Sequence, residues 1–294
     1  MDSIQETPTR FCRFLDESYF TELHRAFLHA FSDYTIEFDL TTEQFRNHIG
    51  LNAVDLASSV GWMEEDRLVG FTLNGFGNWH GVPTVYDAGT GVFPEFRRQG
   101  ISLKMFEMMM PLFASKGYRQ CLLEVITTNV KAINLYLRLG FKQTRKLSLL
   151  NCQSAAEFSV DLPTGNIEIR EIGDADWSLL RTFWDGEPSW QNTTDAIDRS
   201  RDKKCFLGAF SRGECIGYLV FSANVGRISQ MAVHPKHRRL GIGNVLLKTM
   251  IEKMSSDHFP QVINIDTSIE SAMTFFTNRG FTERLSQYEM LCPL

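Results

Sequence analysis

The chain has 294 residues, of which 43% are hydrophobic and 22% are charged, and its formal net charge is −5. This length is enough for two ordinary domains, and the composition is that of a soluble globular protein. The negative charge argues against a protein that binds nucleic acid or an anionic membrane, and no run approaches the roughly 20 apolar residues that a membrane span needs.

The N-terminus and the cysteines favour a cytoplasmic protein. The first ten residues, MDSIQETPTR, lack the basic and apolar regions of a secretory signal peptide. The six cysteines are scattered without a Cys-x-x-Cys pair, and the seven histidines show no metal-ligand spacing. We therefore expect reduced thiols and no metal site.

The first half of the chain alternates between strand-like and helical segments. After a strand-like start, the apolar residues of segment 21–31 recur at helical spacing, and Thr41 and Gln44 match a capping box that opens a second helix. The later segments read, in order, as a hairpin, a strand, a helix, an apolar strand, a helix and a last strand: residues 58–73, 84–92, 101–113, 120–126, 129–140 and 141–152.

The second half repeats this order. The segment VFPEFRRQGIS starts at residue 92 and VHPKHRRLGIG starts at residue 233, and Gly140 and Gly280 are likewise separated by about half the chain. A spacing of this length indicates a duplicated domain. We predict an N-terminal domain over residues 1–152, a linker over 153–166 rich in small, polar, Pro and Gly residues, and a C-terminal domain over 167–294.

The repeated segments resemble the acetyl-CoA signature of the GCN5-related N-acetyltransferases (GNAT), in which a strand ending in V-x-P is followed by R/Q-x-x-G-x-G/A at the start of a helix. The family's second signature is matched by LEVITTNVKAINLYLRLGF, residues 123–141. The resemblance covers nearly the whole chain. It implies an α/β fold of the α+β type, with two tandem domains that each have a mixed, mostly antiparallel central sheet flanked by helices.

The same resemblance implies a site for acetyl-CoA in each half. A helix N-terminus offers N–H donors and positive potential to a pyrophosphate, and glycine lets the backbone come close. In the family, the strand before the motif also splays from its neighbour and binds the pantetheine amides. The residues expected to bind the cofactor are Val92, Phe93, Arg97, Arg98, Gln99, Gly100, Ile101, Ser102 and Asn129 in the first half, and Val233, His234, Arg238, Arg239, Leu240, Gly241, Ile242 and Gly243 in the second.

Two residues of the first half are the expected catalytic groups. Tyr136 stands at the family position whose phenol donates to the CoA sulfur, and Glu124 at that of a general base that often acts through water. Tyr136 could instead only fill space, Glu124 could be structural, and Asn129 could only cap its helix. Asp87 is a weaker base candidate, because strand alternation leaves its facing uncertain.

The second half departs from the signature at each of these points. Asn264, Ile269 and Phe276 stand where Glu124, Asn129 and Tyr136 stand in the first half. A phenyl ring cannot donate a proton. We therefore predict that the first half is catalytic and that the second half is a structural or regulatory partner.

The leading function is transfer of an acetyl group from acetyl-CoA to a primary amine, on a small molecule or a protein, by direct attack in a ternary complex. A non-catalytic acyl-CoA-binding or sensing protein is the alternative. A third possibility, transfer from aminoacyl-tRNA, agrees poorly with the net charge, and we expect no nucleic-acid or membrane partner. The acceptor stays open, with Asp33, Asp39, Trp79 and His80 as weaker candidates for its pocket, and the protein is expected to be a monomer or a homodimer.

Overall fold

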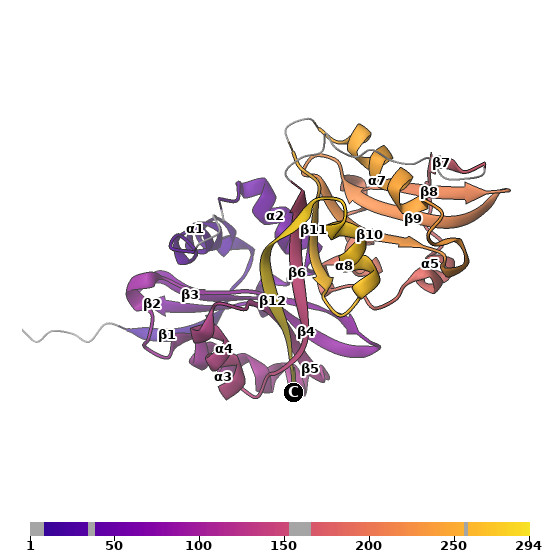
Figure 1. Ribbon diagram of the computed structural model, residues 1–294. Coiled ribbons are helices and arrows are strands. Elements are labelled where there is room, and N and C mark those ends of the chain that lie inside the picture. Colours follow the sequence, from indigo (N-terminus) through magenta and orange to yellow (C-terminus); the bar gives the residue numbers. More distant parts are fainter. Residues whose placement is uncertain (1–8, 35–38, 153–165, 256–257) are drawn as a thin grey trace, which may run out of the picture. The chain divides into compact units, whose positions relative to one another are not determined.

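The computed structural model describes residues 9–34, 39–152, 166–255 and 258–294, which form two compact units. Unit 1 contains residues 1–144 and 289–294, and unit 2 contains residues 145–288. Nearly all of the expected linker, 153–166, lies outside the described residues. Each unit is a mixed α/β structure (Figure 1).

The sheet of unit 1 is antiparallel except for one pair of strands. Its order is β1-β2-β3-β4-β5, followed by the end of β12 (Phe281–Pro293). Only β4 and β5 are parallel neighbours among the registers from β1 to β5. These strands are β1 (Arg10–Phe14), β2 (Val60–Glu64), β3 (Arg67–Trp79), β4 (Val82–Val92) and β5 (Gln120–Ile126).

Helices cover both faces of this sheet. Figure 1 shows α1 (Phe20–Ala30) and α2 (Thr42–Leu51) on one face, and α3 (Ile101–Ser115) and α4 (Val130–Arg138) on the other. The predicted capping box of α2 is confirmed, because the Gln44 amide donates to the Thr41 hydroxyl and the Thr41 amide donates to the Gln44 side chain. The apolar faces of α1 and α3 are buried on the sheet, as their spacing predicts.

Unit 2 repeats the plan. Its strand order is β6-β11-β10-β9-β8-β7, in which β10 and β11 are the parallel pair. One core packs α7 and α8 on the sheet, and a second core packs the segment of α5 and α6 on the other face. The elements are β6 (Lys142–Cys152), β7 (Glu168–Glu171), α5 (Trp177–Leu180), α6 (Thr194–Arg199), β8 (Cys205–Ser211), β9 (Glu214–Ser222), β10 (Arg227–Val233), α7 (Ile242–Lys253), β11 (Gln261–Asp266) and α8 (Glu270–Thr277).

The last strand of each sequence repeat lies partly in the unit that is formed mainly by the other repeat. All of β6 comes from the first repeat, yet most of it lies in unit 2, where it pairs antiparallel with β11, with Leu150 opposite Val262. The end of β12 comes from the second repeat, yet it lies in unit 1, where the Leu294 amide donates to the Arg119 carbonyl at 2.9 Å. The compact units therefore divide the chain differently from the sequence repeat.

The parallel pair of each unit separates where the repeated motif begins. β4 pairs with β5 only from Thr84 to Asp87, although β4 continues to Val92. In unit 2, β10 pairs with β11 only at Arg227 and Ile228. The registers shift just after these points, at Ala88 and at Ser229, so both splays start at a bulge. This is the splay that the family resemblance implies.

Candidate active site

A turn with left-handed backbone leads into the helix after each splay. Arg98 and Gly100 have φ values of 63° and 75° immediately before α3, and Arg239 and Gly241 have 64° and 81° before α7. Left-handed residues in such a turn point successive N–H groups toward one concave side, which is a common anion-binding arrangement. A Cβ built on Gly100 would meet no atom within 4 Å, so the space in front of this turn is open.

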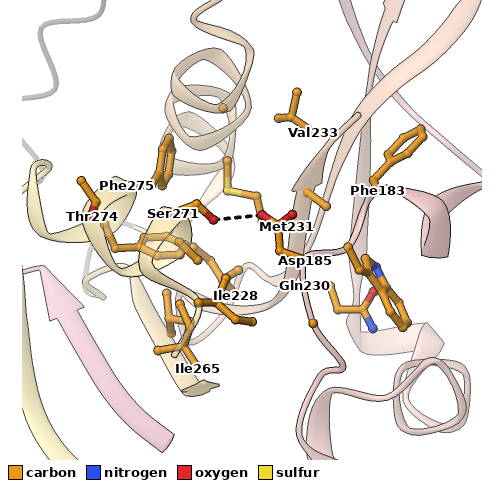
Figure 2. Close-up of a pocket in the computed structure, with 18 of the residues that line it drawn as sticks. Phe183, Asp185, Ile228, Gln230, Met231, Val233, Ile265, Ser271, Thr274 and Phe275 are labelled. Atoms are coloured by element: carbon orange, nitrogen blue, oxygen red, sulfur yellow. Dashed lines mark hydrogen bonds between the residues drawn. The ribbon is translucent and has the colours of Figure 1, made fainter. Parts of the chain in front are cut away.

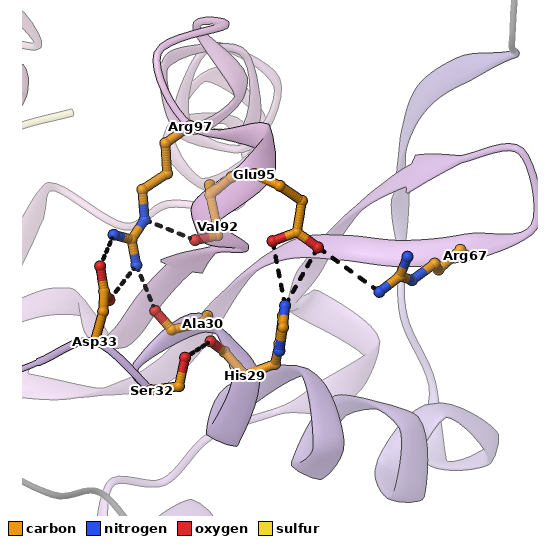
Figure 3. A network of polar contacts seen from close by, with 8 residues as sticks. All are labelled: His29, Ala30, Ser32, Asp33, Arg67, Val92, Glu95 and Arg97. Atoms are coloured by element: carbon orange, nitrogen blue, oxygen red, sulfur yellow. Dashed lines mark hydrogen bonds and ion pairs between the residues drawn. The ribbon is translucent and has the colours of Figure 1, made fainter.

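The first arginine of each motif is used inside its own unit. Figure 3 shows Arg97 reaching from the motif to the end of α1, where its guanidinium donates to the Asp33 carboxylate at 2.6 and 2.8 Å and to the Ala30 carbonyl at 2.7 Å. Its Nε also donates to the Val92 carbonyl at 3.1 Å. The hydrogen bond from Arg97 holds the pKa of Asp33 below its usual value.

Unit 2 repeats this arrangement with Arg238. Its guanidinium donates to Asp185 at 2.8 and 3.0 Å, to the Phe183 carbonyl at 2.9 Å and to the Val233 carbonyl at 3.0 Å. Both arginines of each pair are expected from the sequence to bind the cofactor. In the structure the first arginine of each pair forms an ion pair, whereas Arg98 and Arg239 are exposed.

Tyr136 lies deep in unit 1, against a carboxyl group. Its hydroxyl donates to Asp87 Oδ2 at 3.4 Å, and the same carboxylate accepts from the Gly89 amide at 3.0 Å and the Thr90 hydroxyl at 2.8 Å. Burial raises the pKa of Asp87 to about 6. Burial, and next the charge of Asp87, raise the pKa of Tyr136 well above its usual value. Tyr136 therefore keeps its proton at neutral pH.

A second carboxyl group lies on the neighbouring strand. Glu124 on β5 accepts a hydrogen bond from the hydroxyl of Tyr86 on β4, one residue before Asp87. The splay in unit 1 therefore carries two carboxyl groups, each in contact with a tyrosine. The Asp87–Tyr136 contact could not be predicted from strand alternation, because the bulge at Ala88 breaks that alternation next to Asp87.

Asn129 has internal partners at both ends of its carboxamide. Its Oδ1 accepts from the Ala132 amide at 3.2 Å, which caps α4, and its Nδ2 donates to the Tyr34 hydroxyl at 2.9 Å. Of the two readings of Asn129, helix capping is present in the structure. Of the weaker acceptor-pocket candidates, Asp33 pairs with Arg97, and Trp79 and His80 lie at the end of the β3–β4 hairpin.

Replacing Asp87 with Asn is expected to change how stability depends on pH. The folded protein keeps a proton on Asp87 up to about pH 6, whereas the unfolded chain loses it near 3.8, so wild-type stability falls as pH rises between these values and stays lower above them. Asp87→Asn should remove this fall and stabilise the protein at pH 7 by up to about 3 kcal/mol, at about 1.4 kcal/mol per pKa unit. Urea unfolding at pH 4, 5, 6 and 8 measures this, and parallel pH curves for the two proteins would contradict it.

Unit 2 lacks these reacting groups but has a large cavity. Phe276, at the position of Tyr136, is buried and packs on Phe281 with ring centroids 5.0 Å apart. Asn264, at the position of Glu124, is only 4% exposed and has a φ of 58°. Its Oδ1 is buried and accepts no hydrogen bond within the described chain. A neutral acceptor of this kind favours a ligand that brings an N–H or O–H donor.

The cavity of unit 2 has a volume of about 1250 Å³ and reaches from the turn before α7 into the β10–β11 splay. Figure 2 shows Met231 and Val233 of β10 on one side and Ser271, Thr274 and Phe275 of α8 on the other. The motifs predict the main site in the first half, and nothing in the sequence indicates this cavity. Cavity size depends on side-chain packing between distant segments, which no local pattern reports.

Neutral side chains join across one wall of the cavity. The Tyr218 hydroxyl accepts from Trp184 Nε1 at 2.5 Å and donates to Gln230 Oε1 at 2.8 Å. Gln230 Nε2 in turn donates to the Asn192 carbonyl at 2.6 Å, and Asn192 Nδ2 donates to the Ile263 carbonyl at 2.7 Å. This chain of bonds fixes the wall but offers no group that titrates near neutral pH.

The sequence of the chain matches a family model described as the acetyltransferase (GNAT) family, over residues 16–141 and again over residues 169–281. The chain belongs to the GNAT family. The two matched segments show that it carries two GNAT domains in tandem, as the motifs predicted.

Solved structures with the same fold support the tandem arrangement. A GCN5-related N-acetyltransferase from Sphaerobacter thermophilus is 15% identical with a TM-score of 0.72, over 97% of this chain and 95% of that one. A putative acetyltransferase from Pyrococcus horikoshii is 13% identical with a TM-score of 0.68, over 100% and 94% of the two chains. A tandem GNAT protein from the clavulanic acid biosynthesis pathway is 12% identical with a TM-score of 0.71, over 98% of both chains. At these identities the likeness shows the fold alone.

Two further features of the described residues concern membrane-spanning helices and metal ligands. None of their helices is long and apolar enough to cross a membrane. Three or more His, Cys, Asp or Glu side chains do not gather as metal ligands in this part of the chain.

Proposed function

We propose that the first GNAT domain transfers an acetyl group from acetyl-CoA to a primary amine by direct attack in a ternary complex. The observation that carries this proposal is the pair of carboxyl–tyrosine contacts, Asp87–Tyr136 and Glu124–Tyr86, at the splay of β4 from β5. This splay leads to the N-terminus of α3, where Gly100 has a left-handed backbone. An acid and a base are the two groups that this reaction needs from the protein. The family shows acetyltransferase chemistry in general, and we propose the following roles for individual residues.

The turn before α3 suits a pyrophosphate. Its N–H groups, the exposed charge of Arg98 and the open space beside Gly100 supply donors, positive potential and room. Val92 and Phe93 would contact the pantetheine through their backbone, with Gln99, Ile101 and Ser102 completing the cradle. Arg97 contributes by holding this turn on α1 rather than by a free charge. The bound cofactor supplies the activated acetyl group.

Glu124 is assigned the role of general base and Tyr136 that of general acid. An alkyl ammonium with a pKa near ~10 must lose a proton before its nitrogen can attack. Glu124 would accept that proton, directly or through water. Tyr136 would give its proton to the departing thiolate, and its raised pKa keeps the phenol protonated at neutral pH before that step. Asp87, with its pKa of about 6, is the alternative base.

In acetyl transfer to the amine, the second GNAT domain is assigned the role of binding acyl-CoA without catalysing the transfer. Its turn repeats the left-handed residues, and Val233, His234, Arg238, Arg239, Leu240, Gly241, Ile242 and Gly243 would bind acyl-CoA there. Phe276 offers no proton to a thiolate. We also propose that the two domains arose by duplication, with residues 1–152 as one copy and residues 167–294 as the other.

An acyl-CoA-binding or sensing protein without turnover is the second candidate function. The cavity of unit 2, large but without an acid, is the observation that favours it. A screen of small amines and peptide N-termini against acetyl-CoA, reading released thiol, separates the two. Release of thiol that depends on an amine supports the transferase. Tight CoA binding without release for any amine supports sensing.

Gly100→Ala tests the predicted cradle in unit 1. Alanine at a φ of 75° costs about 1–2 kcal/mol of strain and places a methyl group in the cradle. We expect the number of CoA molecules bound per chain, measured by calorimetry, to fall from two to one.

Gly117→Ala is the matched control, since Gly117 has a φ of 94° and equally open surroundings but follows the end of α3. It should lose similar stability and keep both sites. If both variants bind CoA equally, the turn at Gly100 is not the CoA-binding cradle of unit 1.

A further inference from the structure

A lysine and two serines meet inside unit 2, at the edge of its cavity. Lys204, directly before β8, donates from Nζ to the Ser229 hydroxyl at 2.8 Å and to the Ser222 hydroxyl at 3.0 Å. Ser222 ends β9, and Ser229 is the bulge residue of β10. None of these three residues belongs to the GNAT signatures or to the roles assigned above.

The environment of Lys204 favours a neutral amine. Burial, and next the positive charge of Arg227, lower the pKa of Lys204 to about 7. Arg227 is the charged group that acts on it, and Arg227 is itself held by Gln191 and Asn192. No carboxylate forms an ion pair with Lys204 in the described part of the chain, so no opposite charge offsets the cost of burying its ammonium form. An uncharged amine has a lone pair and can act as a base.

Ser229 stands on the cavity wall at the point where β10 leaves β11. It lines the cavity, begins the splay from β11 and is followed four residues later by the V-x-P motif. The residue at the same distance before the motif in unit 1 is Ala88, which has no nucleophile. Unit 2 thus lacks the phenol and carboxylate of unit 1 but has a serine in hydrogen-bond contact with a base.

We propose that Ser229 and Lys204 form an acyl-accepting nucleophile–base pair, with Ser222 orienting the lysine. A nucleophile within 2.6–3.2 Å of a base that a third group holds is the general arrangement of hydroxyl nucleophiles in acyl transfer. In the neutral form of Lys204, the Nζ lone pair accepts a hydrogen bond from the Ser229 hydroxyl over the same 2.8 Å contact. Ser229 Oγ attacks the carbonyl carbon of a CoA thioester, and Lys204 Nζ takes the hydroxyl proton. The C–S bond breaks, and the ammonium returns that proton to the thiolate, which leaves acyl-Ser229 and free CoA. This step rests on the proposed binding of acyl-CoA in unit 2.

The test is covalent labelling of the full chain, followed by intact mass and peptide mapping. Two donors are used: acetyl-CoA, and p-nitrophenyl acetate, a small activated ester that needs no CoA site. We expect one acetyl group on Ser229, removed by hydroxylamine because it is an ester, and labelling that speeds up as pH rises through about 7. Ser229→Ala and Lys204→Met should reduce labelling at least tenfold, and Ser222→Ala by less.

Controls separate chemistry from folding. Ser211→Ala, at the β8–β9 turn, should label like wild type, and Ser229→Cys should keep a nucleophile of similar size and become thioacylated. All variants are compared by thermal melting.

Each outcome decides the proposal. A hydroxylamine-resistant acetyl group on Lys204 would overturn it, because the lysine would then be the nucleophile. So would the absence of labelling by the activated ester in a folded protein that binds CoA by calorimetry. If the ester labels Ser229 while CoA fails to bind unit 2, the pair stands and the cofactor role proposed for the second domain fails.

Discussion

Replacing Tyr136 with Phe is expected to lower kcat for amine acetylation by about 10²–10³-fold, with little change in the Kd for CoA. The phenol is buried with its hydroxyl toward the splay, so the substitution removes the proposed proton donor and little packing. Phe276 in unit 2 shows that a phenyl ring is accommodated at this helix position. Steady-state kinetics with acetyl-CoA, together with calorimetric titration of CoA, measure both quantities.

Tyr118→Phe is the matched control for this experiment. Tyr118 also belongs to unit 1 and packs on Phe76 and Phe113, but it lies outside the splay. Its loss of a hydroxyl should leave kcat within about twofold of wild type. A Tyr136→Phe enzyme that turns over as fast as the Tyr118→Phe enzyme would exclude Tyr136 as the acid.

Removing residues 289–294 is expected to destabilise unit 1, although these residues end the second sequence repeat. Met290 and Cys292 are 1% and 4% exposed, and Cys292 lies against Gly140 and the Leu139 carbonyl. The Thr144 hydroxyl also donates to Glu289. Losing two buried apolar side chains costs at least about 3 kcal/mol, and about 2–4 °C in Tm per kcal/mol predicts a fall of about 10 °C.

The truncation is measured by thermal melting of the full-length and shortened proteins. Deleting Leu294 alone is the control, because it removes one backbone hydrogen bond and should lower Tm by only about 2–4 °C. If the longer deletion melts like the control, residues 289–293 do not support unit 1.

Much of the fold could be predicted because its signals are local. The capping box of α2, the hairpin turns and the apolar strand β5 depend on neighbouring residues, and each is present in the structure. The assignment of the end of β12 to unit 1 could not be predicted. The apolar pattern of a strand indicates that the strand is buried, but it does not indicate which unit the strand joins.

The candidate site was predictable only where a family motif names a position. Tyr136 and Glu124 were identified by the second signature, and the turns at Gly100 and Gly241 by the first. The contacts of these residues depend on geometry between distant segments. Asp33 is 64 residues from Arg97 in the sequence, yet its carboxylate pairs with the guanidinium that the motif alone would assign to phosphate.

The pair in unit 2 shows the same limit. Lys204 and Ser229 are 25 residues apart and stand in no recognised pattern. β8 and β10 flank β9, and the contact arises because Lys204, before β8, reaches past Ser222 at the end of β9 to the bulge of β10. Burial, which lowers the pKa of the lysine, is likewise a property of the folded unit and not of its sequence neighbours.

A crystal structure with bound CoA shows whether unit 1 holds the thioester beside Tyr136. We predict the pyrophosphate on the N–H groups around Gly100 and the CoA sulfur within hydrogen-bond reach of the Tyr136 hydroxyl. A pyrophosphate elsewhere on unit 1, or a sulfur on the far side of β4 from Tyr136, would contradict it.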